Sequence, residues 1–181
     1  EEQYFEINNR CVWPNVIDAH RLEFYMIFIM TRGEGIYTFG PTELYIRENT
    51  LCFIGPDMIR SWRAQMDEQQ GFFVNFSETF FSQGFMNRRM LHDFPFFQVG
   101  GHPVIQLSET ESQDYLTLFQ WMKKEYDNRT EFSHAILRSY LHLLLHKANA
   151  HVKEEKPDTV YDNGAGIRLV KAFKALYMRD F

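Results

Sequence analysis

The sequence predicts an α+β chain, with an antiparallel β-barrel or sandwich before Ser108 and helices after it. Between Phe24 and Phe76, short apolar runs rich in aromatic residues alternate with turn residues. After Ser108, apolar residues recur at steps of three and four, which is typical of helices with one buried face. Short strands at such close spacing favour an antiparallel barrel or sandwich over a parallel sheet with crossover helices.

Each predicted strand combines β-branched and aromatic residues and ends at Gly, Pro, Asn or Asp, which supply turn conformations. Residues 1–19 are mixed, and the stretch around Trp13 and Pro14 is predicted to be an edge strand or an arm. The six predicted strands are residues 24–30, 36–39, 43–47, 51–54, 59–64 and 71–77.

Two segments connect the strands to the helical part. Residues 77–85 are predicted to form a short helix, because Ser77 can cap its first turn and Glu78 suits the positive end of its dipole. Residues 92–103 contain too much Pro and Gly for a regular element. They are predicted to form a loop that lays Phe94, Phe96 and Phe97 onto the barrel.

Helical periodicity predicts one helix over residues 109–128 and a second over 132–152. The second helix is apolar on more than one stripe, so we expect it to contact another chain as well as its neighbour. Residues 153–164 have the composition of a linker, and residues 165–181 are predicted to form an amphipathic helix.

Composition narrows the class of protein. A chain of 181 residues, 45% of them hydrophobic, is one domain or one domain with an appendage. The net charge of −5 gives no overall attraction to nucleic acid. The longest apolar run, Phe24–Met30, is far shorter than the roughly 20 residues that span a bilayer. Cys11 and Cys52 lack metal-ligand spacing, which favours a reduced, cytoplasmic setting.

No catalytic or metal-binding pattern stands out. A first-row metal needs three or four converging donors, and the candidates on the predicted strands are scattered. His142 and His146 share a helix face, but two ligands fill only half of a metal shell, and such a pair more often marks a polar helix edge. No nucleophile elbow or phosphate-binding loop is present, so neither catalytic residues nor a cofactor are expected. The scattered donors are His20, Glu23, Glu34, Glu43 and Cys52.

The strand 59–64 carries the most informative local pattern. Side chains alternate along a strand, so Arg60, Trp62 and Ala64 share one face. If that face points inward, a guanidinium held beside an indole could bind a carboxylate or a hydroxyl-rich ligand. If it points outward, Arg60 is a solvated surface charge. The strand alone leaves both readings open.

An ordered series of segments resembles the sensor region of AraC-type (AraC/XylS) transcriptional regulators. The segments are HRLEFYMIFIMTRGEGIYTFG (20–40), LYIRENTLCFIGPDMIRSW (44–62) and GFFVNFSETFF (71–81). ILRSYLHLLLHKA (136–148) is similar to the family's dimerisation helix, and IRLVKAFKAL (167–176) to the first helix of its DNA-binding domain. The resemblance implies a cupin-like barrel followed by helices that pair two protomers.

The resemblance also implies a barrel without its metal and a chain without most of its DNA-binding domain. The places that supply metal ligands in metal-binding cupins hold His20, Leu22, Met26 or Ile27, and Arg60. The family reads DNA through two helix-turn-helix units, and only the first helix is matched here. We therefore expect a fragment with a barrel and arm (1–107), a dimerisation region (108–152), a linker (153–164) and the start of a DNA-binding domain (165–181).

The predicted function is to sense a small molecule in the barrel, a sugar or a carboxylate, and to control attached DNA-binding domains as a homodimer. The predicted ligand-binding residues are Arg60, Trp62, His20, Tyr25 and Tyr37, with Trp13 closing the barrel from the arm. Two alternatives are a metal-dependent cupin isomerase or dioxygenase, and a dimerising module whose barrel is filled by its own Phe side chains. In the predicted homodimer, the interface consists of Leu137, Tyr140, Leu141 and Leu144.

Overall fold

A computed structural model describes residues 3–10, 14–40, 42–56, 58–84, 90–98, 101 and 103–154 of the chain. Trp13, Cys11, the predicted linker beyond residue 154 and the predicted helix over 165–181 lie outside the described residues. The expectations attached to them therefore remain predictions.

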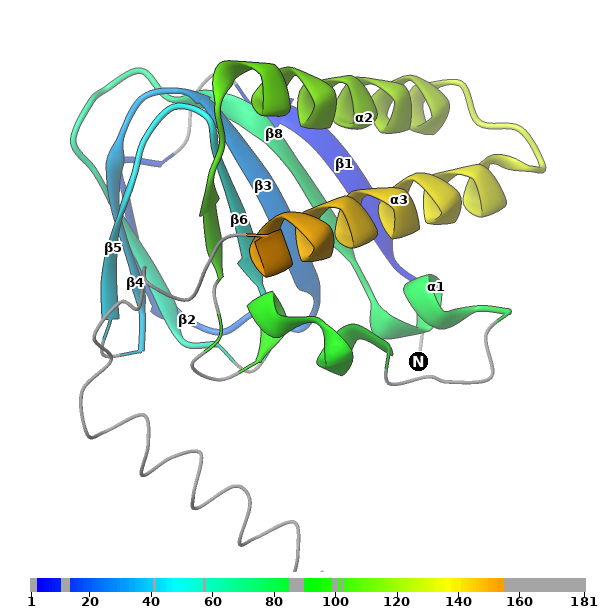
Figure 1. Cartoon of the computed structure of the whole chain (residues 1–181), viewed down its shortest axis with the longest axis horizontal. Coiled ribbons are helices and arrows are strands. Elements are labelled where there is room, and N and C mark those ends of the chain that lie inside the picture. The colour runs from blue at the N-terminus through cyan, green and yellow to red at the C-terminus, as the bar shows by residue number, and fades with distance from the viewer. Residues whose placement is uncertain are drawn as a thin grey trace, which may run out of the picture.

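Two antiparallel sheets face each other and form the barrel (Figure 1). The five-stranded sheet has the order β1 (Phe5–Arg10), β8 (Gln70–Phe76), β3 (Tyr25–Arg32), β6 (Thr50–Ile54) and β9 (Val104–Gln106). The four-stranded sheet has the order β2 (Val16–His20), β7 (Arg60–Ala64), β4 (Gly35–Phe39) and β5 (Thr42–Ile46). The predicted α+β fold, an antiparallel cupin-like barrel followed by helices, is confirmed.

All six predicted strands are present, and the structure adds three more. β1 and β2 are edge strands of different sheets, so the N-terminal stretch contributes to both walls of the barrel. β9 is three residues long, begins directly after the predicted loop over residues 92–103 and pairs with β6. Phe94, Phe96 and Phe97 are buried against the barrel wall as predicted. Phe96 and Phe97 belong to the 3₁₀ turn Pro95–Phe97, and Phe94 separates it from the 3₁₀ turn Met90–Asp93.

The helices begin where side chains satisfy their first backbone N–H groups. α1 (Glu78–Ser82) is capped by Ser77, whose hydroxyl accepts from the backbone N of Phe80 at 3.1 Å. α2 (Glu109–Asp127) begins after Ser108, which forms a capping box with Glu111. α3 (Ser133–Glu154) returns antiparallel to α2, as Figure 1 shows. Caps of this kind explain why the helical part starts immediately after Ser108.

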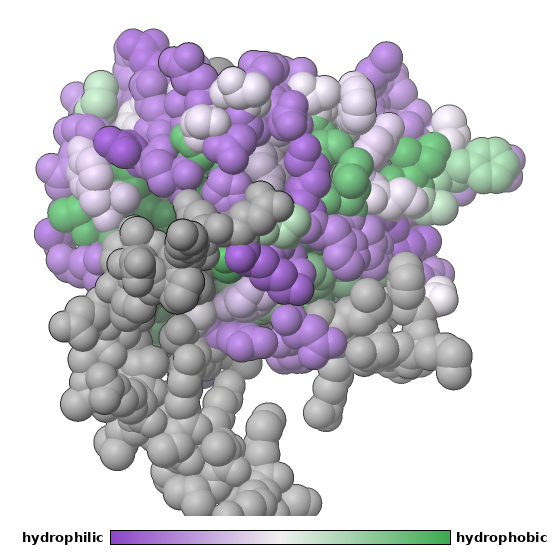
Figure 2. All heavy atoms as spheres, in the orientation of Figure 1, coloured by the Kyte–Doolittle hydropathy of each residue, from purple (hydrophilic) through white to green (hydrophobic). Residues whose placement is uncertain are grey.

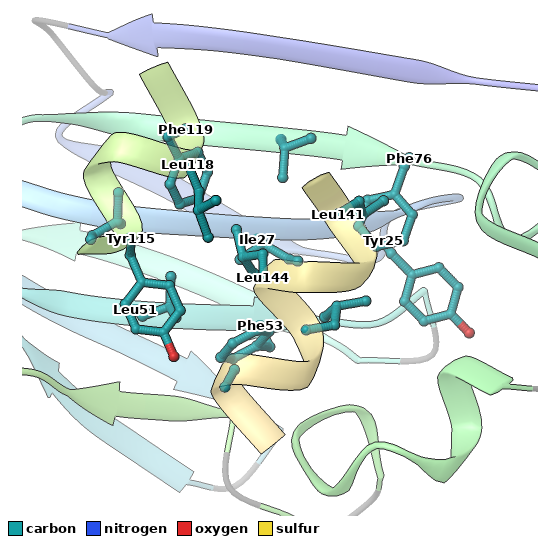
Figure 3. Close-up of a cluster of buried hydrophobic side chains, with 14 of the residues drawn as sticks. Tyr25, Ile27, Leu51, Phe53, Phe76, Tyr115, Leu118, Phe119, Leu141 and Leu144 are labelled. Carbon is teal, nitrogen blue, oxygen red and sulfur yellow. The ribbon is translucent and has the colours of Figure 1, made fainter. Parts of the chain in front are cut away.

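A first hydrophobic core, the helix–sheet core, lies between the five-stranded sheet and the two long helices. Figure 3 shows side chains from the sheet meeting side chains from α2 and α3 across this layer. The outward-facing residues of β3, β6 and β8 supply one wall, and the apolar faces of the helices supply the other. Labelled members are Tyr25, Ile27, Leu51, Phe53, Phe76, Tyr115, Leu118, Phe119, Leu141 and Leu144.

A second core, the barrel core, fills the space between the two sheets. Alternation along each strand sends every second residue to this side. On β3, for example, Met26, Phe28 and Met30 point into the barrel, whereas Ile27 and Ile29 point to the helices. The buried members of the barrel core are Phe28, Met30, Tyr37, Leu44, Ile46, Cys52, Ile54, Trp62 and Phe73.

Most of the wide apolar surface of α3 is covered within its own chain, so contact with another chain is not needed to explain it. α3 packs on the sheet, on α2 and on α1, and three neighbours cover more of a helix than one stripe. Leu137, Leu141 and Leu144 are at most 1% exposed. They cannot contact a second protomer in this fold, so the predicted dimer interface is wrong at these three positions.

Candidate functional site

Arg60 and Trp62 point into the barrel, which decides between the two readings of this strand. β7 lies between β2 and β4, and Arg60 pairs with His20 on one side and Phe39 on the other. Arg60 and Trp62 are 5% and 3% exposed, whereas Arg63, on the opposite face of the same strand, is exposed. The inward face of β7 therefore places a guanidinium and an indole inside the barrel.

Arg60 is the only buried charged side chain among the residues that the structure describes. Its Nη1 donates to the hydroxyl oxygen of Tyr37 and lies 3.7 Å from the sulfur of Met26. Its Nε is buried without a hydrogen-bond partner, and no ion pair to Arg60 is formed within the described ranges. A buried charge without a counter-ion is costly, by several kcal/mol even after relaxation. The site is therefore suited to an anionic group.

Tyr37 supplies a second polar group at the same place. Burial raises the pKa of Tyr37 to about 12, although the Arg60 guanidinium acts in the opposite direction. The hydroxyl therefore keeps its proton at neutral pH, and it can donate that proton while its oxygen accepts from Arg60. The ring of Tyr37 stacks on Phe39, with centroids 4.7 Å apart, and its centroid is 5.7 Å from that of Trp62.

Trp62 is held in place by a buried glutamine that sequence reasoning missed. The indole Nε1 donates to Oε1 of Gln69 at 3.1 Å, and Gln69 in turn donates to the backbone oxygen of Met66 at 2.9 Å. Gln69 is fully buried although it follows a run of polar residues that resembles a surface turn. Because its N–H group is already bonded, Trp62 offers a ring surface to a ligand. A Cβ at Gly35 would lie 2.4 Å from this ring, so only glycine leaves room for it.

The other predicted ligand-binding residues are distributed unevenly. His20 is half-buried at the end of β2 beside Arg60, and its Nδ1 lies 2.7 Å from the backbone oxygen of Asp18. Tyr25 does not face the barrel. It packs in the helix–sheet core, with its ring 4.9 Å from Phe97, because its position on β3 alternates with that of Met26. The expectation that Tyr25 lines the barrel is therefore corrected.

Asn75 is a further polar residue of the barrel interior. It is 5% exposed and lies opposite Met26 in the β3–β8 pairing. Its Nδ2 donates to Oε2 of Glu6 at 3.3 Å, and Glu6 also accepts from the hydroxyl of Tyr4 at 2.6 Å. Its Oδ1 is buried without a partner. The signal that could have found it is a single amide within the apolar strand GFFVNF.

The donor set does not fit the metal that many cupin barrels hold. Within the part of the chain that the structure describes, no three His, Cys, Asp or Glu side chains converge. The barrel interior presents Arg60, aromatic rings and thioethers, and a guanidinium repels a cation. His142 stacks on Phe81, and its Nε2 lies 3.3 Å from the backbone oxygen of Phe81, while His146 packs against Phe94.

The helical hairpin carries three exposed apolar side chains, near the half-buried Tyr140, which packs against the helix–sheet core. We call Trp121, Phe132, Tyr140 and Leu143 the outer helix patch. Trp121, Phe132 and Leu143 are 50%, 65% and 47% exposed, and the rings of Trp121 and Tyr140 lie 5.9 Å apart. Figure 2 shows green, hydrophobic side chains between α2 and α3 and at the end of the hairpin. A patch of this kind is a candidate contact surface.

Comparison with known families and structures agrees with this fold. The model of the family described as AraC-like ligand binding domain matches residues 4–145. Among solved structures, apo ToxT from Vibrio cholerae, an AraC-family regulator, is 13% identical and has a TM-score of 0.51. The match covers 81% of this chain and 56% of ToxT, so this chain spans little more than half of that protein's length.

Shorter matches are to cupin barrels. A cupin-2 protein from Shewanella frigidimarina is 13% identical over 39% of this chain and 66% of its own, with a TM-score of 0.32. Oxalate decarboxylase from Bacillus subtilis is 14% identical over 41% of this chain and 21% of its own, with a TM-score of 0.36. No curated protein matches the chain. In the described residues, no helix is both long and apolar enough to cross a membrane.

Proposed function

Because this chain belongs to the family of AraC-like ligand-binding domains, we propose that it senses a small molecule inside its barrel. The ligand would lie against Arg60, Tyr37 and the ring of Trp62, with His20 at the same end of the barrel. The ligand would be a carboxylate or a hydroxyl-rich molecule, because a guanidinium can donate paired hydrogen bonds to either. No metal takes part in this proposal.

One observation supports the proposed ligand site. Proteins almost never bury an arginine without a partner, yet Arg60 is buried with an unbonded Nε and with no carboxylate paired to it within the described residues. Its position in the barrel, ringed by aromatic side chains, is where a ligand would supply the missing charge. Elsewhere in the described chain, the buried polar residues carry no charge.

The test is a thermal-shift screen against carboxylates and carbohydrates, made with the wild-type chain and two variants. A ligand that binds the folded state raises the melting temperature by mass action. We expect Arg60→Met to remove the shift and Arg63→Met to keep it, because Arg63 lies on the same strand and faces outward. A ligand whose shift survives Arg60→Met would remove Arg60 from the site.

The screen and an analysis of metal content together distinguish this proposal from two competing functions. A cupin isomerase or dioxygenase would copurify with a stoichiometric transition metal, which elemental analysis of the protein would detect. A module that only dimerises would have a barrel filled by its own side chains and would show no shift with any compound. A ligand shift that depends on Arg60, in protein without stoichiometric metal, would contradict both alternatives.

We further propose that the sensor acts within a cytoplasmic transcription regulator and reaches DNA only through domains beyond this barrel. Ligand binding would shift the population between two arrangements of the helices and their attached domains, which requires different ligand affinities in the two. The family membership supports this role. Its test is operator binding by the full regulator with and without a ligand found in the screen.

We propose that two copies of the chain form a homodimer through the outer helix patch. Of the four residues predicted from the sequence to form the interface, only Tyr140 is retained. Two exposed rings and Leu143 could meet the same surface of a second copy across a twofold axis. The double variant Trp121→Glu, Leu143→Glu should be monomeric in light scattering, near the chain mass of 21.7 kDa. Gln120→Glu, an exposed neighbour outside the patch, should leave the dimer intact. A double variant that stays dimeric would place the interface elsewhere.

A further inference from the structure

We infer that the ligand is a carboxylate that carries a hydroxyl or amino group next to its acid group, with the acid at Arg60 and the neighbouring donor at Asn75. This inference rests on the proposed function and specifies the chemical class that the barrel would bind.

Two buried atoms without partners lie on facing walls of the barrel. Nε of Arg60 belongs to the four-stranded sheet, and Oδ1 of Asn75 belongs to the five-stranded sheet. Met26 connects them. Its sulfur lies 3.7 Å from Nη1 of Arg60, and its Cα pairs directly with that of Asn75. Side chains of directly opposed residues share one face and lie within reach of each other. Arg60 and Asn75 are therefore both neighbours of Met26, one on each wall of the barrel.

The two atoms have opposite requirements. Nε of Arg60 is a donor and needs an acceptor, and the Tyr37 hydroxyl beside it can donate as well. Oδ1 of Asn75 is an acceptor and needs a donor, while Nδ2 of the same amide is already bonded to Glu6. A carboxylate alone would satisfy Arg60 and leave Asn75 unbonded. An α-hydroxy or α-amino acid carries both an acceptor and a donor, and with its acid group at Arg60 it would have a donor left for Asn75 across the side chain of Met26.

The surroundings are apolar at this end of the barrel. Phe28, Ile54, Phe39 and Met58 belong to the barrel core or pack against it, and none offers a strong hydrogen bond. A site with few polar groups in an apolar lining gains specificity from those groups, because an analogue that lacks one leaves a buried atom unpaired. The hydroxyl or amino group should therefore decide between otherwise equal acids.

The experiment compares acids that differ by one hydroxyl, using isothermal titration of the whole chain. The pairs are mandelate against phenylacetate and lactate against propionate, which cover two sizes of ligand. We expect at least one hydroxy acid to bind about tenfold more tightly than its partner, the effect of one added hydrogen bond. Asn75→Leu should equalise the pair by weakening the hydroxy acid, and Arg60→Met should remove binding of both.

Each outcome decides the inference. The wild-type comparison needs no variant, so it stands even if Asn75→Leu fails to fold, which circular dichroism would reveal. Equal binding within both pairs, no binding of either hydroxy acid, or a preference that survives in folded Asn75→Leu would overturn it. Arg60-dependent binding of an uncharged sugar alone would overturn the inference and leave the proposed function standing. Absence of any Arg60-dependent ligand would overturn both.

Discussion

The two cores lie on opposite faces of the same five-stranded sheet and differ in their polar content. The helix–sheet core consists of aliphatic and aromatic side chains, from Ile27 on the sheet to Leu144 on α3, and the buried polar residues of α2 and α3 are the small serines Ser112 and Ser133. The barrel core borders Arg60, Gln69 and Asn75, all of them buried. Since polar groups cost free energy when buried, the first core is optimised for packing. The second core gives up stability for polar groups that the proposed ligand would bind.

The largest effect is expected where packing is tightest. Leu144→Ala should lower the free energy of unfolding by about 2–5 kcal/mol, because it removes a buried side chain and leaves a cavity under α3. Urea denaturation would measure this value. Leu143→Ala is the matched control, one position away and 47% exposed, and should cost less than about 0.5 kcal/mol. Similar losses in the two variants would mean that α3 packs differently from this structure.

In the barrel, by contrast, we expect a substitution to increase the stability of the protein. Arg60→Met should raise the free energy of unfolding of the ligand-free protein by about 1–4 kcal/mol, because it replaces an uncompensated buried charge with an apolar side chain. Arg63→Met, on the exposed face of the same strand, should change it by less than about 0.5 kcal/mol. A clear loss of stability in Arg60→Met would mean that the guanidinium serves packing, and the contrast between the two cores would disappear.

A smaller effect is expected at the junction of the barrel and the helices. Ser108→Ala should destabilise the protein by about 1 kcal/mol, since the Ser108 hydroxyl accepts from the backbone N of Glu111 and both residues form the capping box. The same urea titration applies. Thr110→Ala, within the first turn, serves as the control and should be nearly neutral. A neutral Ser108→Ala would show that packing alone sets the start of α2.

The smallest effect is a pH dependence that originates on the helix side. Burial lowers the pKa of His142 below its usual 6.5. The unfolded chain therefore binds this proton more readily than the folded chain, and the contribution to stability is lost as pH falls below about 6.5. Melting temperatures between pH 8 and pH 5 should fall less steeply in His142→Gln. An unchanged slope would exclude His142 as the group responsible.

Alternation and periodicity predicted the fold because each strand and helix carries its own signal. All six predicted strands and the helix boundaries at Ser77 and Ser108 follow from local residue patterns. Local residue patterns do not predict features that depend on which elements pack against each other. β9 is too short to show a pattern, and the direction of Arg60 depended on which sheet covers β7. Tyr25 was misplaced because its strand is apolar on both faces, so neither face stands out.

The site was predicted only in part for the same reason. Arg60, Tyr37 and Trp62 were identified from one strand and a resemblance, and the structure brings them together. Gln69 and Asn75 were missed because a single amide produces no periodic pattern in the sequence. Their relevance to the site comes from their burial, which only the structure shows. The helix pattern found an apolar surface on α3 but could not tell that the sheet, rather than a second chain, covers Leu141.

Gly35 has a consequence for the arrangement of the barrel interior. The indole of Trp62 occupies the space where any side chain at position 35 would stand. A methyl group there would also lie 2.6 Å from the backbone oxygen of Arg63, so both the ring, which sits between Gln69 and Tyr37, and the β4–β7 pairing would have to shift. The place of the indole in the barrel is thus set by an absent side chain. Gly35→Ala is accordingly expected to disturb the sheet and the proposed site together.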